Sequence, residues 1–535
     1  MSFDSILTFI GIIIAVLALI PRAKLLFIKV KVSWYDISII ILCFLVILYL
    51  LFYKSFLVIG LSPGWNLYRW QITPSNSIFI ILLILTCYLF FRINFFSFSI
   101  RKINKVERLI DNLMQEEKYN DLIEFLDINF ERLEKISERK TTYLKLRDRA
   151  KKRDYSLEHI LLEDKRTPKL DRIIKFLLIP LRILPHYNNY SSDASVIVSK
   201  VILNENFLDH IVKSHSYIFL KFFNVDKFYR DDFVDLIFRK LLSDNRSVLY
   251  IELENTQNLH HYSNYWIIDS NKLIYYLFNE PKTSEKLGIW QPVGEYIIEK
   301  MDYLKRHPEL DNYNTNIQNF YESSRWKSDI FVAIHFFDVM VSQALYKNIQ
   351  WHMWLYYYRY FIEGIAKNHT DTDMFYDQYA EWPTKYEYLI YQIFNNMRNW
   401  LKSLDEIDLQ QENIKLDNTK LTMDNGNIPV STINAIGQCL KILFDSSTIA
   451  SHFKNYIFSI IFNLYFELRK NDSLANYSKV LAKAILYKFD YVRGDLQEYY
   501  AFIEDTFENH YDKIPIPFEL LEEFRDILSN RANNL

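Results

Sequence analysis

The stretch "DISIIILCFLVILYLLFY", Asp36 to Tyr53, is an apolar run whose only charge stands at its first residue. A membrane-spanning helix needs about 20 mainly apolar residues, so this run predicts a transmembrane helix. Similar runs flank it on both sides: "SFDSILTFIGIIIAVLALI", Ser2 to Ile20, and "SIFIILLILTCYLFF", Ser77 to Phe91, which extends to Phe98 if Arg92 reaches the headgroups. Three such runs at one end of a chain exceed the patterning of buried soluble helices. We therefore predict a transmembrane module over residues 1–98, with spans at 5–20, 36–53 and 77–98.

The charges between these runs predict the orientation of the module. The loop after the first run and the segment after the third are basic, and they contain Arg22, Lys24, Lys29 and Lys31, and Arg92, Arg101, Lys102, Lys105 and Arg108, respectively. The loop between the second and third runs has only Lys54 and Arg69. Since Lys and Arg are enriched in cytoplasmic loops, we expect the N-terminus outside and the large C-terminal part in the cytoplasm. The first run lacks a basic leading region and is followed by Pro21 and Arg22, so we do not expect it to be a cleavable signal peptide.

The first run also carries a stripe of small residues on one helix face: Thr8, Gly11, Ala15 and Ala18. Small residues allow membrane helices to approach one another closely. The stripe predicts helix packing, either within one subunit or between subunits around an axis.

The rest of the chain has a helical composition, because the whole sequence contains only 9 glycines. Residues 99–189 are interpreted as a helical hairpin, Arg101 to Ile136 with a break at "EKYND", followed by a basic connector. The run "SVLYIELE", Ser247 to Glu254, is the best candidate for a strand. A polar stretch from Lys402 to Pro429 separates a helical sensor core, 190–401, from a C-terminal helical region, 430–535. The predicted fold class is mainly α: N-terminal transmembrane helices followed by a large all-helical cytosolic domain.

Several classes of enzyme are disfavoured by missing motifs. The sequence has neither a G-x-x-x-x-G-K-[ST] nor a G-x-G-x-x-G pattern, which argues against P-loop and Rossmann cofactor sites. The three cysteines are far apart and no H-E-x-x-H occurs, so we expect no metal site, no cofactor and no catalytic residue. The acids of "TDTDMFYD" (Asp371, Asp373 and Asp377) lack the glycine and the glutamate of a calcium loop, and we interpret them as solvated.

A basic run, "RKTTYLKLRDRAKKR", extends from Arg139 to Arg153. It has three interpretations: a solvated helix face, a contact with anionic lipid headgroups, or a phosphate-binding surface. Its last residues, Lys151, Lys152 and Arg153, are the candidate ligand-binding residues. The run continues as "RDYSLEH", in which Arg153 and His159 resemble the arginine and histidine of HEPN-type ribonucleases. A membrane-anchored HEPN-like ribonuclease is therefore an alternative function.

The stretch "WHMWLYYYRYF", Trp351 to Phe361, contains seven aromatic residues. At about 100° per residue, one helix face collects Trp351, Trp354, Leu355, Tyr358, Phe361, Ile362 and Ile365. We therefore predict a buried helix whose rings form core. A polar stripe made of Asn348, His352, Arg359 and Glu363 interrupts it. The stripe is either an internal salt-bridge network or the charged wall of a ligand pocket, which makes His352, Arg359 and Glu363 candidate ligand-binding residues.

The layout of the spans at 5–20, 36–53 and 77–91, followed by a helical remainder without catalytic motifs, resembles the membrane effectors of bacterial anti-phage defence, in particular the membrane effector of the Hailong system. The resemblance implies a ligand-gated ion channel in the bacterial inner membrane, built as a homo-oligomer for which a tetramer is one arrangement. It also implies control by a nucleotide or a single-stranded DNA oligomer made by a partner nucleotidyltransferase, and depolarisation of the cell as abortive infection. It assigns a role to no individual residue. A membrane scaffold that binds a protein partner is a further alternative.

Overall fold

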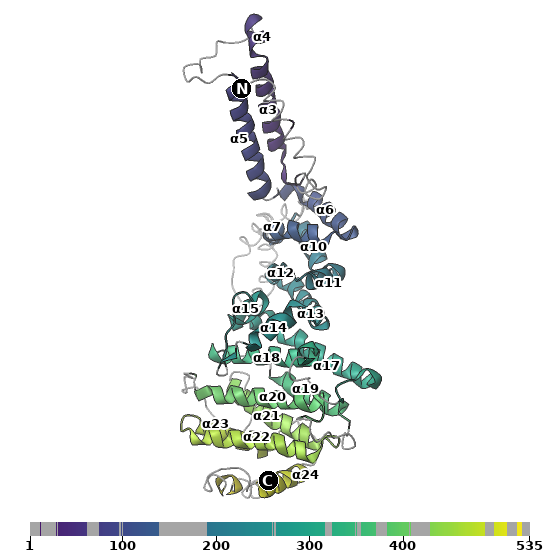
Figure 1. Ribbon diagram of the computed structural model, residues 1–535, viewed down its shortest axis with the longest axis vertical. Helices are drawn as coiled ribbons and strands as arrows, with labels where there is room; N and C mark the ends of the chain where they lie inside the picture. The colour runs from purple at the N-terminus through teal and green to yellow at the C-terminus, as the bar shows by residue number, and fades with distance from the viewer. Residues whose placement is uncertain are drawn as a thin grey trace, which may run out of the picture. The chain divides into compact units, whose positions relative to one another are not determined.

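A computed structural model describes residues 11, 28, 30–60, 74–95, 98, 100–138, 190–258, 260–261, 264–315, 324–347, 349, 355–370, 382–405, 407, 428–486, 497–510 and 522–526. The chain divides into two compact units, Met1–Phe207 and Leu208–Leu535. The prediction of a mainly helical protein is confirmed, and the described helices are drawn in Figure 1.

In the part that the structure describes, the first unit contains two helical hairpins, one further long helix and two short helical segments. Its elements are α3 (Trp34–Leu51), α4 (Tyr53–Val58), α5 (Pro74–Phe95), η2 (Ile100–Lys102), α6 (Ile103–Gln115), α7 (Tyr119–Ser137) and α10 (Tyr190–Ile202). Helices α3 and α5 lie side by side (Figure 1), and they coincide with the second and third apolar runs. Of the first run, the structure describes Gly11 alone.

The predicted hairpin of residues 101–136 is present as α6 and α7. The break at "EKYND" is a short turn in which Glu117 adopts a left-handed φ of 53°, and the Lys118 N–H donates to the Leu113 carbonyl. Both helices are amphipathic, and their apolar faces are buried together with α10, which packs on both. A sequence period of 3.6 was therefore sufficient to predict this hairpin.

Among the residues that the structure describes, the second unit is a stack of helices with one small β-hairpin. Its elements are α11 (Glu205–Lys213, which begins at the unit boundary), α12 (Phe219–Phe222), α13 (Lys227–Ser243), α14 (Val248–Asn258), β1 (His260–His261), β2 (Asn264–Tyr265), α15 (Lys272–Phe278), α16 (Pro281–Leu287), α17 (Trp290–Arg306), η3 (Pro308–Leu310), η4 (Ser324–Lys327), α18 (Asp329–Tyr346), α19 (Tyr356–Asn368), α20 (Lys385–Lys402), η5 (Ser403–Asp405), α21 (Ile428–Asp445), α22 (Ser451–Lys470), α23 (Ala475–Leu486) and α24 (Gln497–His510). The two antiparallel strands pair His260 with Tyr265.

Helix α18 is the central core helix of this unit. Ser328 caps its N-terminus by accepting a hydrogen bond from the Phe331 N–H, and 89% of the helix is buried. By length and composition α18 and α3 are the two described helices that could cross a membrane, but only 17% of α3 is buried. Burial of α18 is the expected state of a core helix, whereas α3 keeps its apolar surface exposed.

The aromatic stretch is described from Leu355 onward, and Trp351 and Trp354 lie outside the described residues. The predicted core face is confirmed where the structure describes it, because Leu355, Tyr358, Phe361, Ile362 and Ile365 of α19 are buried. The opposite face of α19 is not fully buried, since the Tyr360 side chain is 44% exposed.

Two expectations differ from the structure. The strand predicted at Ser247–Glu254 is wrong, because from Val248 onward this run forms the beginning of α14 and buries Leu249 and Leu253, which lie four residues apart. Short apolar runs fit strand and helix periods equally well. The division into 190–401 and 430–535 also differs from the observed units. Residues 190–202 pack with α6 and α7, and α21 and α22 pack on α19 and α20 across the polar stretch.

Candidate functional site

The hairpin of α3 and α5 is held together by a small apolar cluster at one of its ends. Ile47 and Leu50 of α3 pack with Ile78 and Leu82 of α5. These residues come late in α3 and early in α5, so the two helices run antiparallel. A consequence is that the beginning of α3 and the end of α5 meet at the other end of the hairpin.

Most of the outer surface of this hairpin is apolar and exposed. On α3 and α4 the exposed large apolar residues are Trp34, Tyr35, Ile37, Ile39, Ile41, Leu42, Phe44, Leu45, Val46, Leu48, Leu57 and Val58, and on α5 they are Ile80, Leu83, Ile84, Phe90 and Phe91. Monomeric soluble proteins rarely expose a continuous apolar surface of this kind, which usually marks a membrane or protein contact.

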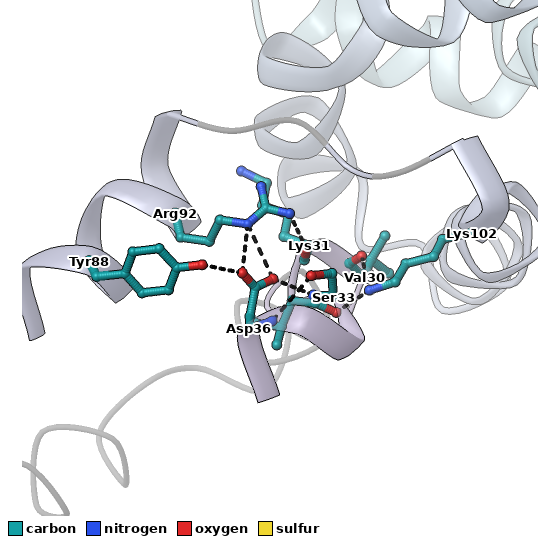
Figure 2. A network of polar contacts seen from close by, with 8 residues as sticks. Val30, Lys31, Ser33, Asp36, Tyr88, Arg92 and Lys102 are labelled. Carbon is teal, nitrogen blue, oxygen red and sulfur yellow. Dashed lines mark hydrogen bonds and ion pairs between the residues drawn. The ribbon is translucent and has the colours of Figure 1, made fainter. Parts of the chain in front are cut away.

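Asp36, Tyr88 and Arg92 form a polar cluster, here called the Asp36 cluster, at the end where α3 begins and α5 ends (Figure 2). Arg92 Nε lies 3.2 Å from both carboxylate oxygens of Asp36. The Tyr88 hydroxyl donates to Asp36 Oδ1. Asp36 also accepts from the Ser33 N–H in a capping box that starts α3. The carboxylate is 2% exposed, and its charge is satisfied by three donors and by the positive end of the α3 dipole.

Arg92 and one further cation, Lys102, bind the backbone that leads into α3. Arg92 Nη2 donates to the Lys31 carbonyl at 3.4 Å. Lys102, at the start of α6, donates from Nζ to the carbonyls of Val30, at 3.0 Å, and Val32. Burial lowers the pKa of the Lys102 ammonium. These contacts connect the hairpin to the helices that follow it, and they gather its charges at one end.

The sequence-predicted ligand residues are only partly described. Lys151, Lys152, Arg153 and His159 lie outside the described residues, as do His352, Asn348 and the stripe residues Thr8, Ala15 and Ala18. At Gly11, no described atom lies within 4 Å of the position that a Cβ would take. Helices α3 and α5 therefore do not pack closely on Gly11.

Arg359 and Glu363 lie on α19 and have different surroundings. Glu363 Oε1 pairs with Lys367 Nζ of the same helix at 2.7 Å. The Arg359 guanidinium lies 5.6 Å from the centre of the Tyr360 ring. Of the polar stripe, Glu363 therefore pairs with Lys367 near the surface and not with Arg359.

Arg359 also lines a small cavity, with Leu355, Tyr356, Ser431, Asn434, Ala435 and Gln438 as the other lining residues. The Asn434 side chain is 1% exposed, and its amide has no hydrogen-bond partner among the described residues. The cavity measures about 10 Å³, which is the space of about one water molecule. A water bound by Asn434 fits this cavity, and a larger ligand does not.

Within the described parts of the chain, no group of three His, Cys, Asp or Glu side chains could hold a metal ion. The acids Asp371, Asp373 and Asp377 lie outside those parts.

Sequence reasoning missed the pairing of Asp36 with Arg92. The signal was present, because Asp36 begins the second apolar run and Arg92 follows the third. An antiparallel hairpin places two such residues at the same end. Comparisons with known protein families, with characterised proteins and with solved structures found no match for this chain.

Proposed function

We propose that this protein is a membrane-embedded, homo-oligomeric effector of bacterial anti-phage defence, which depolarises the inner membrane under the control of a ligand sensed by its helical cytosolic part. The hairpin of α3 and α5 is the part that we place in the bilayer. The exposed apolar surface of α3 and α5, whose charged residues Asp36 and Arg92 pair at one end of the two helices, is the observation that carries the proposal.

The physical basis is the free-energy difference between placing these apolar side chains in water and placing them in lipid. Burial of apolar surface is worth about 25 cal/mol per Å², so exposure of the α3 and α5 side chains to water is strongly unfavourable. In a bilayer the same side chains are solvated by lipid. The Asp36 cluster and Lys102 then lie at the headgroup level, on the cytoplasmic side by the distribution of basic loops.

Assembly is proposed to use the small-residue stripe of the first span. Since no described atom of α3 or α5 lies close to Gly11, packing between subunits is the interpretation we favour. A pore lined by such spans is apolar, and it can be gated by dewetting.

The test combines membrane potential with assembly. Induced expression of the wild type should depolarise cells, as followed with a potential-sensitive dye. Gly11→Leu should abolish both depolarisation and the oligomer, because the added side chain prevents close helix approach. Ile13→Leu is the matched control and should leave both intact, because a helical period of about 100° per residue separates it from Gly11 by about 200°. Unchanged assembly and depolarisation in Gly11→Leu would refute the pore.

Topology is tested by labelling with an impermeant thiol reagent in a background with Cys43, Cys87 and Cys439 replaced by serine. Asn66→Cys should be labelled from outside and Lys24→Cys should not. The opposite pattern contradicts the orientation.

The two alternatives have their own outcomes in these experiments. RNA cleavage without added metal by the purified protein, lost in Arg153→Ala and His159→Ala, would favour the HEPN-like ribonuclease. Neither cleavage nor depolarisation, together with stable capture of a protein partner, would favour the scaffold.

A further inference from the structure

The second unit contains a cavity of about 650 Å³ that is separate from the hairpin and from Arg359. Its walls come from the end of α11, the turn between α13 and α14, the second half of α17, the segments at η3 and η4, and the beginning of α18. Figure 1 shows α13, α14, α17 and α18 within the same stack of helices. Small-molecule sites commonly have volumes of about 300–1,000 Å³, so the cavity has the size of a nucleotide site.

The cavity is lined by more positive than negative side chains. The cations are Lys213, Lys240, Arg246, Lys300 and Lys327, and the acids are Asp209, Asp244 and Asp329. Three of the cations face the three acids: Lys240 Nζ lies 2.8 Å from Asp209, Lys300 Nζ lies 3.2 Å from Asp329, and Arg246 Nε lies 3.6 Å from Asp244.

The two remaining cations, Lys213 and Lys327, are exposed, and neither forms an ion pair with any residue that the structure describes. They belong to different elements, α11 and η4, yet both line this cavity. Because the three acids are each neutralised, the cavity has a surplus of two positive charges. Such a surplus favours an anion with more than one negative charge.

The wall of the cavity is fixed by buried hydrogen bonds. The Tyr313 hydroxyl lies 2.9 Å from Ser328 Oγ and donates to Asp329 Oδ1 at 3.1 Å. The Tyr250 hydroxyl donates to the Leu242 carbonyl at 2.6 Å. Asp329 is thereby held against Lys300. A site with preformed walls binds a ligand at a smaller entropic cost.

We propose that this cavity binds a phosphate-bearing small molecule of nucleotide size, with Lys213 and Lys327 as the residues that contact its phosphates. Lysine ammonium groups are common phosphate ligands, and a polyphosphate supplies the charge that the cavity lacks. That the bound molecule is the signal controlling the effector rests on the proposed function. Binding of the molecule to this cavity does not require a pore.

The experiment measures binding of two probes, ATP and inorganic tripolyphosphate, to the purified full-length protein in detergent by titration calorimetry. We expect both to bind, with affinity falling as salt is added. Lys213→Ser/Lys327→Ser should weaken binding by roughly tenfold or more, since bonds to charged groups are the strong ones. These substitutions leave all three ion pairs of the cavity in place, so the fold is preserved.

The matched control is Lys282→Ser/Lys286→Ser on α16, which removes the same charge from two exposed lysines outside the cavity. It should bind both probes like the wild type. Equal weakening in the control and in the cavity variant would mean non-specific attraction and would overturn the site. Absence of binding by either probe would overturn it too. Binding of ATP but not of tripolyphosphate would assign part of the affinity to the nucleoside and keep the phosphate contacts, provided the cavity variant still weakens it.

A second readout separates this inference from the proposed function. If the cavity variant loses probe binding and wild-type cells do not depolarise, the site stands and the pore fails. If cells depolarise and no probe binds, the pore stands and the site is refuted.

Discussion

Gly437 of α21 lies directly against the backbone of α23. A Cβ built on Gly437 would stand 2.4 Å from the carbonyl oxygen of Ala484. This is far closer than atoms can approach, so only glycine allows the two helices to pack at this separation. In contrast, a Cβ on Gly364 of α19 would meet the flexible sulfur of Met301 at 2.3 Å.

We expect Gly437→Ala to lower the free energy of unfolding by about 1–3 kcal/mol, because a backbone carbonyl cannot move aside. Gly364→Ala should cost less, since the Met301 side chain can change rotamer and alanine favours the helix. Chemical denaturation of both variants beside the wild type provides the measurement. Equal costs would show that α21 and α23 can separate as easily as a methionine can rotate.

The buried Asp338 predicts a pH dependence of stability. Its carboxylate accepts hydrogen bonds from Trp400 Nε1 at 2.7 Å and from the Tyr265 hydroxyl, yet burial raises its pKa from 3.8 to about 6. Since the folded state holds this proton more tightly than the unfolded chain, its contribution is fully present below about pH 4 and is lost as pH rises through 6.

The expected loss is roughly 3 kcal/mol, from the difference between the two pKa values. Urea unfolding of the wild type and of Asp338→Asn between pH 4 and 7 measures it, and the asparagine variant should show a flatter profile. The comparison is repeated in a His335→Gln background, because His335 Nδ1 lies 3.9 Å from Asp338 Oδ2. Parallel profiles for wild type and Asp338→Asn would contradict the assignment.

The ion pair of Asp36 with Arg92 should stabilise the hairpin. Arg92→Met leaves the buried Asp36 carboxylate without its cation, and loss of one partner of a buried pair costs roughly 3–5 kcal/mol. Asp36→Asn in the same chain removes the uncompensated charge and keeps an acceptor for Tyr88. Thermal unfolding in detergent should therefore show a large drop for Arg92→Met and partial recovery in the double variant.

Lys54→Met on α4 is the control for this pair, because it removes one exposed cation from the same hairpin. Its effect should stay within about 0.5 kcal/mol. If the double variant is no more stable than Arg92→Met, Asp36 is already solvated and the pair is not what holds the hairpin.

Arg359→Met should change stability little, because Glu363 keeps its pair with Lys367. Exposed i,i+4 pairs contribute only about 0.3–0.5 kcal/mol. Glu363→Gln is expected to behave alike. Thermal melts of both variants test this, and a drop of several kcal/mol in Arg359→Met alone would mean that Arg359 satisfies a buried group that Glu363 does not.

The apolar period of the amphipathic helices could be predicted from the sequence. The turn at Glu117 between α6 and α7, and the core face of α19 at Tyr358, Phe361 and Ile362, follow from the spacing of apolar residues. The run at Ser247–Glu254 was wrongly assigned to a strand, because eight residues fit both periods and only packing around Leu249 and Leu253 selects the helix.

The sequence by itself determined the helical class, the apolar runs that form α3 and α5, and the charged residues at the ends of those runs. These are properties of neighbouring residues. Tertiary structure alone decided which side chains meet. It paired Asp36 with Arg92 across 56 positions, and it brought Lys213 and Lys327 to one cavity. Such meetings depend on how helices pack in three dimensions, and no local pattern of residues encodes that.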